Sequence, residues 1–588
     1  MTDTDAVTQA LAAAYDETPY QSNAFSFSAP GHLRAVAALY GVSAPPVANA
    51  RVLELGCAAG GNLLPYAVAH PDGHAVGVDL SAQQIEAGQS IVKAMGLKNL
   101  DLRAMSITDI TPEFGQFDYI IVHGVFSWVP PEVREAILRV CRENLAPEGI
   151  AYISYNTYPG WKASDVVRDA MILNSHGAQT PEEQLARAKD MLSMLENGLW
   201  GNNPMRAALQ QAARQLRQQS DYYLMHEHLE AVNAPCYFLE FVAAAQQAGL
   251  TYLTDAEPQS TIASNFGNNV AVLHGALSAD TGREMREQYL DFAVGRQFRK
   301  SLLIRSERAD QILDIPEANA LEKMHLAAHL TLERAPAGAP SKERHYRTLS
   351  GINIASQDSS FIAIADALRT AWPRPATFQE LVDAARPKAR KATTDDQLRE
   401  QILHHLVLML NANALQYRLE PVGYGGDDAK PKWIPGLARL HALTRETALQ
   451  VGPYNLWHQQ TRLPTDAVGR FVIGHIDQGA SVADIRTRLR DALASGELSH
   501  PNGKSLKRVR NLDPVAQTIL SDVLGRLRIQ GLANLGRPRR PGVEPERGEF
   551  IPPLFISTRP RPDLCIARAC TKKNVLRKFS LKSGFGLP

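Results

Sequence analysis

The sequence predicts an α/β fold near its N-terminal end, built on a parallel, doubly wound sheet, with mainly helical regions after it. Two observations support this prediction. The apolar run Arg51–Leu55 ends in the Gly-rich turn Gly56–Asn62, and the next apolar run, Ala75–Asp79, ends in an acid. Short apolar runs then alternate with helical patterns as far as Tyr155. This order is the layout of a nucleotide-binding βαβ unit.

Each element of this first region follows from a local pattern. Short apolar runs predict the strands, and apolar residues at helical spacing predict the helices between them. Pro131 followed by Glu132 suits the start of a helix. The expected strands are Arg51–Leu55, Ala75–Asp79, Leu100–Ala104, Phe117–His123 and Ile150–Tyr155, and the helices lie near Leu63–Ala69, Ala82–Met95 and Pro131–Leu145.

Beyond residue 165 the pattern becomes helical and rich in Ala, Gln and Leu. The helices expected there are Pro181–Leu199, Met205–Gln218, Tyr237–Ala248 and Thr281–Leu302. In a third region, Phe378–Ala385, Leu398–Asn411 and Leu415–Leu419 follow the order helix, helix, strand of a winged helix. Helical patterns at Phe471–Gln478, Val482–Ala494 and Pro514–Gln530 suggest a diverged repeat.

A chain of 588 residues is too long for one core. We expect a first domain with an N-terminal cap at 1–165, a helical middle domain at 166–345, a winged-helix-like region at 346–536 and a basic, disordered tail at 537–588. That tail carries 12 Lys/Arg and 4 Asp/Glu, a net charge of +8. The whole chain is +1, so the first 536 residues carry −7, which argues against nucleic acid as a partner.

The five cysteines, with no C-x-x-C pair, predict neither a zinc site nor a disulfide framework and suit a reducing cytoplasm. No signal-peptide pattern and no apolar run of membrane-spanning length is found, so we expect a cytoplasmic protein without stable membrane insertion. His226-Glu-His228 lacks the H-E-x-x-H spacing, so a structural or interface role is favoured over a metal site.

The Gly-rich turn does not have the dinucleotide-binding spacing. It resembles motif I of class I S-adenosylmethionine (SAM) methyltransferases, E/D-x-G-x-G-x-G, because Glu54, Gly56 and Gly60 match while Ala58 replaces the middle glycine. SAM has no phosphate, so the loop that binds it does not depend on a helix N-terminus. Instead, the loop backbone must come close to the cofactor. The resemblance implies a Rossmann-like methyltransferase domain with SAM as cofactor and S-adenosylhomocysteine (SAH) as product.

Ligands of an open parallel sheet bind beyond the carboxyl ends of its strands. Asp79 is expected to accept hydrogen bonds from the ribose hydroxyls, and the third strand end to meet the adenine through Ser106, the Ile107 amide or Asp109. The fourth strand end, at His123, would lie beside the methionine moiety. The expected cofactor contacts are Glu54, Gly56, Cys57, Ala58, Gly60, Asn62, Asp79, Leu80, Ser106, Ile107, Asp109, His123 and Gly124.

Two groups are candidates for the transfer itself. His123 is either a general base or a satisfied buried histidine, and the second interpretation is favoured. The fifth strand runs into Ser154-Tyr-Asn-Thr-Tyr-Pro-Gly-Trp161, where aromatic faces could hold an amine and polar atoms could orient it. The opposite interpretation is a packed corner with the aromatics as core. The candidate catalytic residues are His123, Tyr155, Asn156, Tyr158 and Trp161.

Longer stretches carry a family resemblance. Four stretches resemble bacterial methyltransferases with a methyltransferase regulatory domain: Tyr15–Phe25, His123–Pro130, Ser154–Trp161 and Asp221–Leu253. The architecture resembles the rickettsial-type protein lysine methyltransferases that modify outer-membrane surface proteins. That resemblance implies methylation of lysine side chains on a protein substrate. If the substrate is a surface protein, it would be methylated before export. The resemblance also allows a homodimer. Methyl transfer from the activated sulfonium needs no metal.

Two alternatives stay open. One is a small-molecule or RNA methyltransferase with the same first domain, because a winged helix can bind nucleic acid. The other is a non-catalytic SAM sensor, in which cofactor occupancy sets the docking of the helical domains. Motif I and Asp79 suit an enzyme and a sensor equally, so turnover separates them.

Overall fold

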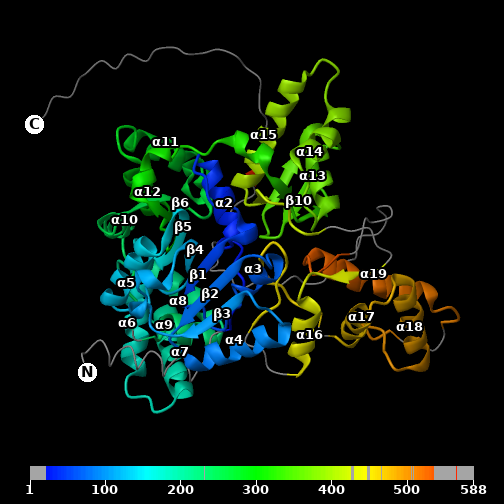
Figure 1. Ribbon diagram of the computed structural model, residues 1–588, viewed down its shortest axis with the longest axis horizontal. Helices are drawn as coiled ribbons and strands as arrows, with labels where there is room; N and C mark the ends of the chain where they lie inside the picture. The colour runs from blue at the N-terminus through cyan, green and yellow to red at the C-terminus, as the bar shows by residue number, and fades with distance from the viewer. Residues whose placement is uncertain are drawn as a thin grey trace, which may run out of the picture.

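The computed structural model describes residues 21–534, except 231, 425–429, 447–450, 465, 505 and 507–508, together with Leu564–Cys565. Figure 1 shows a central sheet in blue and cyan, with helices α17–α19 at the far right of the view. Residues 1–20, where the predicted N-terminal cap begins, lie outside the described residues. So does the predicted tail, apart from Leu564–Cys565, which form the short strand β15.

A seven-stranded sheet organises the first half of the chain, in the order β3-β2-β1-β4-β5-β7-β6. The first five strands are parallel, as predicted. The chain order reverses between β1 and β4, so the switch point lies at the carboxyl ends of those two strands. The strands are β1 (Arg51–Leu55), β2 (His74–Asp79), β3 (Leu100–Ala104), β4 (Phe117–Val122), β5 (Leu145–Asn156), β6 (Leu250–Asp255) and β7 (Phe298–Arg305).

The last two strands correct the sequence prediction. Thr281–Leu302 was expected to be one helix, but α12 (Arg283–Val294) ends at Gly295 (φ +61°), and β7 follows it. β7 is antiparallel to both β5 and β6, so the sheet is mixed. It also crosses the domain boundary predicted at residue 165. The physical reason is that a buried run such as Phe298–Arg305 pairs with the exposed edge of β5 whatever its distance along the chain.

Alternation along the strands builds two cores, one on each face of the sheet. In β5, Tyr152 belongs to the core that contains α2 (Pro30–Leu39), α3 (Leu64–Ala69) and α4 (Ala82–Met95). Tyr155 belongs to the core on the other face. That second core is covered by the helices α5 (Pro131–Glu143) and α10 (Phe238–Gln247).

The middle of the chain contains a third, separate core formed by helices alone. These helices are α6 (Trp161–Ser175), α7 (Pro181–Asn197), α8 (Arg206–Arg217) and α9 (Asp221–His228). The helices predicted at Pro181–Leu199, Met205–Gln218 and Tyr237–Ala248 are confirmed as α7, α8 and α10. Helix α11 (Asn268–Leu277) precedes α12.

Short strands connect the third region to the end of the middle region. Strand β12 (Gln416–Arg418) pairs antiparallel with β8 (His325–Ala327). The other strands are β9 (Leu330–Glu333), β10 (Arg344–Thr348) and β11 (Asn353–Ser356), and the helices are α13 (Ser359–Ala371), α14 (Phe378–Ala385) and α15 (Asp395–Asn411). The predicted order helix, helix, strand is present at α14, α15 and β12, and the assignment as a winged helix stays a prediction.

Four further helices lie among the described residues in the second part of the third region. They are α16 (Leu437–Glu446), α17 (Ala467–Asp477), α18 (Val482–Ser495) and α19 (Asp513–Ile529), with the strands β13 (Lys432–Trp433) and β14 (Ala533–Asn534). Arg439 of α16 donates to the carbonyl of Met95 in α4, which anchors this part of the chain to the first domain. Across the described ranges, no helix is both long and apolar enough to span a bilayer.

Candidate active site

Left-handed backbone at alternate positions shapes the turn after β1. Gly56 (φ +73°) and Gly60 (φ +77°) take the conformation that glycine favours, and Ala58 adopts it too (φ +48°). A Cβ at Gly56 would lie 2.4 Å from Cγ2 of Val125, in the segment after β4. Motif I therefore lies directly against the end of β4, with Ala58 in the position of the missing glycine.

Asp79 locks this turn to the end of β2. Its Oδ2 accepts the Ala58 amide at 2.8 Å, and its Oδ1 accepts the Ser81 amide at 2.9 Å. A carboxylate oxygen can accept more than one hydrogen bond, so ribose hydroxyls could be added to the partners that Asp79 already has. Leu80 is half-buried beside it, and Ser81 caps α4. The structure thus places Asp79 where the sequence predicts it.

Glu54 and Asn62 form a buried polar pair under the turn. Glu54 is 3% exposed, and its Oε1 accepts from Asn62 Nδ2 at 2.8 Å. Its Oε2 has no hydrogen-bond partner among the described residues. Burial raises the pKa of Glu54 to about 8. A buried carboxylate oxygen without a partner is suited to receive a cationic ligand.

The residues at the carboxyl end of β3 do not single out one contact for the adenine. Ser106 Oγ accepts the Thr108 amide at 3.3 Å and so caps the turn Ile107–Asp109. Ser106 and Ile107 are half-buried, and Asp109 is exposed. All three stand beyond β3, as predicted, and which of them meets the adenine stays open. Cys57 is buried in the turn, and burial raises the pKa of its thiol well above the usual value.

His123 contacts two polar side chains of β5 that were not predicted from the sequence to lie beside it. Its Nδ1 lies 3.1 Å from Tyr152 Oη and 3.0 Å from Ser154 Oγ, both from β5. Ser154 Oγ also accepts the Gly124 amide at 2.9 Å. Gly124 is left-handed (φ +69°), and a Cβ there would meet no atom within 4 Å. The period-two alternation of β5, which puts residues 152 and 154 on one face, is the signal that could have found this group.

Aromatic rings enclose His123 on several sides. The ring centroids of Phe25, Phe27 and Phe298 lie 4.1, 5.3 and 6.3 Å from that of His123. Burial, with the nearby charge of Lys300, lowers the pKa of His123 to about 3, so it is neutral at pH 7. We call His123, Tyr152, Ser154 and the three phenylalanines the histidine chamber, a name for a cluster of side chains in contact, in which Tyr152 and Ser154 are fully buried.

The structure places Tyr155 away from His123, the other predicted catalytic residue in this part of the sheet. The Tyr155 ring points to the opposite face of β5, where it is 1% exposed and stacks on Phe241 with centroids 4.1 Å apart. Its hydroxyl lies 3.1 Å from Ser301 Oγ. Strand alternation puts Tyr155 and Tyr152 on opposite faces, so Tyr155 does not face the histidine chamber. This placement does not support a catalytic role for Tyr155.

The rest of the predicted corner is packed rather than open. Asn156 is buried, and its Nδ2 donates to Asn233 at 3.1 Å. Trp161 is buried between Trp128, edge-on at 6.5 Å, and His228, stacked at 5.4 Å. This arrangement matches the alternative interpretation of the corner as core. It also places His228 in a packing role.

Tyr158 is half-buried, and its partners come from the chain itself. Its hydroxyl donates to Asp165 at 2.8 Å, and the ammonium of Lys162 lies over its ring at 3.5 Å. The structure therefore does not gather Tyr155, Asn156, Tyr158 and Trp161 around one pocket. Within the described part of the chain, no cluster of three or more His, Cys, Asp or Glu side chains is arranged to hold a metal.

Two family models match the chain. A methyltransferase domain matches residues 52–149, and a predicted methyltransferase regulatory domain matches residues 220–305. An uncharacterized protein of Rickettsia prowazekii is 39% identical over 234 residues, which are 40% of this chain and 94% of that protein. The chain belongs to the class I SAM-dependent methyltransferases that carry a methyltransferase regulatory domain.

Two further comparisons cover more of the chain. Another uncharacterized Rickettsia prowazekii protein is 44% identical over 294 residues, so the match spans about half of each chain (50% and 53%). PKMT2 from Rickettsia typhi, in complex with AdoHcy, superposes with a TM-score of 0.75 at 26% identity. That superposition covers 88% of this chain and all of PKMT2.

SAM is the cofactor of this methyltransferase and SAH its product, and the site fits them. The unpartnered Oε2 of Glu54 suits the cationic methionine end of SAM. The empty space beside Gly124 allows the close approach that this end requires. Asp79 would hold the ribose, as its position beyond β2 indicates. The histidine chamber would lie next to the methionine end of bound SAM, because β4 is the direct neighbour of β1.

Proposed function

We propose that this protein transfers methyl groups from SAM to lysine side chains of protein substrates. The observation that supports the proposal most is the histidine chamber itself. It joins neutral polar atoms and aromatic walls at the end of β4, directly beside the cofactor turn. When bound, SAM supplies a methyl group already activated by its sulfonium, so transfer forms an N–C bond as the S–C bond breaks.

The chamber suits an amine that must be neutral before it attacks. A lysine nitrogen has a lone pair only after it loses a proton, and desolvation between aromatic rings favours the neutral form. Lys300 adds to this effect, because its ammonium lies 4.3 Å from the ring of Phe27 and carries the same charge. Lys300 is itself paired with Glu257. These groups replace the Tyr155 and Trp161 corner as the proposed site of desolvation.

In this proposal His123 orients the lysine side chain and does not remove its proton. With a pKa of about 3 it is a weak base for an ammonium, so the lysine loses its proton through desolvation. Because Ser154 Oγ accepts the Gly124 amide, its own proton can point to His123 Nδ1. The ring proton then sits on Nε2, the nitrogen away from β5.

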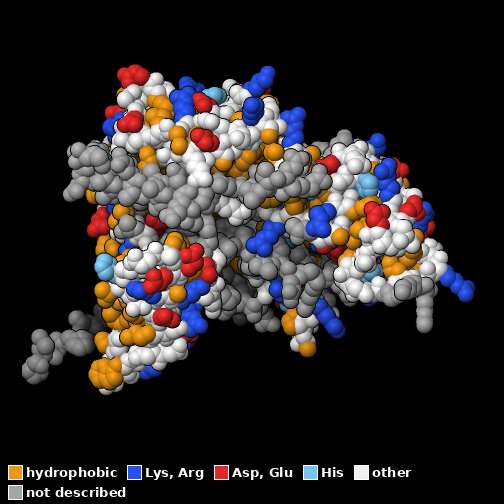
Figure 2. All heavy atoms as spheres, turned by 90° about the horizontal axis from the view of Figure 1, so that it is seen from below, with side chains coloured by type: hydrophobic (Ala, Val, Ile, Leu, Met, Phe, Trp, Pro, Cys, Tyr) orange, Lys and Arg blue, Asp and Glu red, His pale blue; other side chains and the backbone are white. Residues whose placement is uncertain are grey.

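A protein acceptor is favoured over nucleic acid. On the face seen in Figure 2, Lys/Arg and Asp/Glu side chains are interspersed, unlike the continuous basic surface of a nucleic-acid binder. The superposition on PKMT2 over most of the chain agrees with the lysine assignment. We further propose that methylation takes place in the cytoplasm, on a surface protein before export, and that α14, α15 and β12 act as a winged-helix-like module.

Labelled methyl transfer from SAM tests the assignment. The full-length protein is incubated with fractionated lysate and surface proteins of the source cell, and labelled bands are analysed by mass spectrometry. We expect label on lysines of defined proteins. Ser154→Ala should lower the initial rate by about tenfold or more, while SAM affinity stays within about twofold of wild type.

The other outcomes are distinct. Label confined to small-molecule or RNA fractions would replace the protein acceptor. Tight SAM binding without label in any fraction would favour a SAM sensor. An unchanged rate for Ser154→Ala, with lysine label present, would remove the histidine chamber from the proposal while keeping the activity.

A further inference from the structure

Asn62 connects the cofactor turn to two distant parts of the chain. Besides its bond to Glu54, its Oδ1 accepts the Phe25 amide at 3.0 Å and lies 3.0 Å from His458 Nε2. Ser28 Oγ lies 3.1 Å from its Nδ2. The Phe25 N–H must meet an oxygen, so the amide is oriented with its oxygen toward Phe25 and His458. That orientation directs the NH₂ group at Glu54.

His458 is presented to Asn62 by a tightly built turn. It is 6% exposed and adopts left-handed backbone (φ +61°), which is uncommon for a residue other than glycine. Asn455 Oδ1 accepts the amides of Trp457 at 2.9 Å and Gln459 at 3.1 Å. The His458 amide donates to the Asn455 carbonyl at 2.9 Å. Strained backbone held by several bonds is typical of a functional position.

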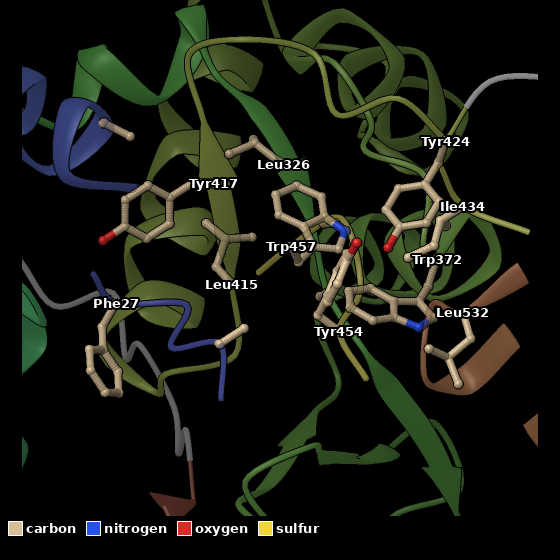
Figure 3. Packing of buried hydrophobic residues seen from close by; sticks show 14 of the residues in the cluster. Phe27, Leu326, Trp372, Leu415, Tyr417, Tyr424, Ile434, Tyr454, Trp457 and Leu532 are labelled. Carbon is tan, nitrogen blue, oxygen red and sulfur yellow. The ribbon is translucent and has the colours of Figure 1, made fainter. Parts of the chain in front are cut away.

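Trp457 anchors this turn in the core of the C-terminal half. It is fully buried, its Nε1 donates to the Pro373 carbonyl at 2.8 Å, and its ring stacks with that of Trp372. Figure 3 shows Trp457 among Trp372, Tyr454 and Leu326. Movement of the C-terminal core would therefore move the neighbouring His458.

A second set of contacts runs parallel to this one. Ser22 Oγ accepts the Gly61 amide of the cofactor turn at 2.7 Å, and the Ser22 carbonyl accepts the Gly452 amide at 3.1 Å. Gln460 donates to Asn23 at 2.9 Å. The segment 22–28 thus lies between the cofactor turn and the segment 451–460. The C-terminal half therefore contacts the cofactor site in two ways, directly through His458 and Asn62 and indirectly through the segment 22–28.

We propose that His458 is a positioning residue of the cofactor site, which holds the Asn62 amide so that it presents Glu54 to SAM. Docking of the segment 451–460 and binding of SAM are then coupled, and each stabilises the other. The inference rests on the SAM site and not on the acceptor. A partner protein that shifts this segment would change SAM affinity from outside the methyltransferase domain.

Calorimetric titration of the full chain with SAM and SAH tests the proposal. His458→Ala should weaken SAM binding about tenfold, because Asn62 loses the donor that fixes its amide. His458→Gln, which can supply an amide donor, should recover most of this loss. His405→Ala is the matched control. His405 is also a buried histidine, but its hydrogen-bond partner is Ser360 Oγ in α13 and not a residue of the cofactor turn.

A double-mutant cycle with Asn62→Ala separates positioning from loss of packing. If His458 acts through Asn62, His458→Ala adds no further loss of SAM affinity in the Asn62→Ala background. Full additivity, or a loss equal to that of His405→Ala, would overturn the proposal. If His458→Ala does not fold, hydrogen exchange of wild type decides: SAH should slow the Gly452 and His458 amides, and unchanged exchange there would refute the coupling.

Methyl transfer is not part of this experiment, so an error in the acceptor assignment leaves its outcome intact. Wild-type affinity for SAM is measured in the same series. That value tests the cofactor site separately from the role of His458.

Discussion

At the scale of single residues, Glu54 has the most consequential environment in the site. It is buried, one of its oxygens lacks a partner among the described residues, and its pKa is raised to about 8. Asn62 holds the other oxygen. In the ligand-free protein the carboxyl therefore keeps its proton near neutral pH. A cationic ligand reverses this preference, so SAM binding at pH 7 should release a proton.

Glu54→Gln separates stability from cofactor binding. The folded pKa lies above the ordinary value of 4.5, so the stability tied to the protonated form is complete below about 4.5 and is lost as pH rises through about 8. Glutamine does not titrate, so the ligand-free variant should become more stable than wild type as pH rises from 5 to 8. Its SAM affinity at pH 8 should fall about tenfold.

Thermal unfolding at several pH values and calorimetry in two buffers of different ionisation enthalpy measure these effects. Glu86→Gln, on the exposed side of α4, is the control. Equal pH dependence of the unfolding temperature in wild type and Glu54→Gln would contradict the raised pKa.

Tyr152 and Tyr155 offer a matched pair on opposite faces of one strand. Tyr152→Phe removes the hydroxyl that lies 3.1 Å from His123, so methyl transfer should slow about tenfold. Tyr155→Phe removes only the contact with Ser301, which should cost about 1 kcal/mol of stability and leave transfer unchanged. Initial rates and urea denaturation measure both. The reverse pattern would restore the corner predicted from the sequence.

At the scale of elements, the cofactor turn depends on the segment that covers it. A Cβ on Gly61 would lie 2.4 Å from the carbonyl oxygen of Ser22, so backbone and not a flexible side chain would have to move. Gly61 was not singled out from the sequence, because its constraint comes from a residue that only the fold brings close. The segment 22–28 is therefore part of the cofactor site.

Gly61→Ala tests this role of the segment. The variant should lose about 1–3 kcal/mol of stability and bind SAM about tenfold more weakly, because the turn and the segment 22–28 must separate. Gly474→Ala, inside α17 with no atom within 4 Å of the added Cβ, should be neutral or stabilising by up to about 1 kcal/mol. SAM affinity that is unchanged in Gly61→Ala would remove the segment from the site.

At the scale of the whole molecule, the two halves are joined by main-chain pairing and by side-chain contacts. β9 pairs with β10 across the loop 335–341, and β8 pairs with β12. Arg34 of α2 pairs with Glu420, and His458 meets Asn62. The loop itself is mostly exposed and contains two prolines. The polypeptide link at this loop is therefore not what holds the halves together.

Cleavage at this loop measures how firmly the halves associate. A protease site inserted within 335–341 should be cut readily, and the two fragments should then elute together at physiological salt. SAM affinity should stay within about threefold of the intact protein, since the His458–Asn62 contact is retained. Fragments that separate at physiological salt would contradict the joined architecture.

Much of the fold could be predicted because it depends on local pattern. β1 and β3 have the predicted bounds, and the helices α7, α8 and α10 lie within two residues of the predicted ranges. β7 was missed because it begins only four residues after the end of α12, and single-sequence periodicity does not distinguish a short buried strand from a continuing helix there.

Local patterns were sufficient to predict the parallel part of the sheet and the cofactor turn with Asp79, because each depends on runs and spacings within about thirty residues. The family followed from four motifs that lie between Tyr15 and Leu253. Tertiary structure decided which side chains meet at the transfer site. The pleat of β5 sends Tyr155 into the core and Tyr152 to His123, β7 brings Phe298, and the C-terminal half brings His458. Contacts between residues hundreds of positions apart arise from the packing of whole elements, which no local pattern encodes.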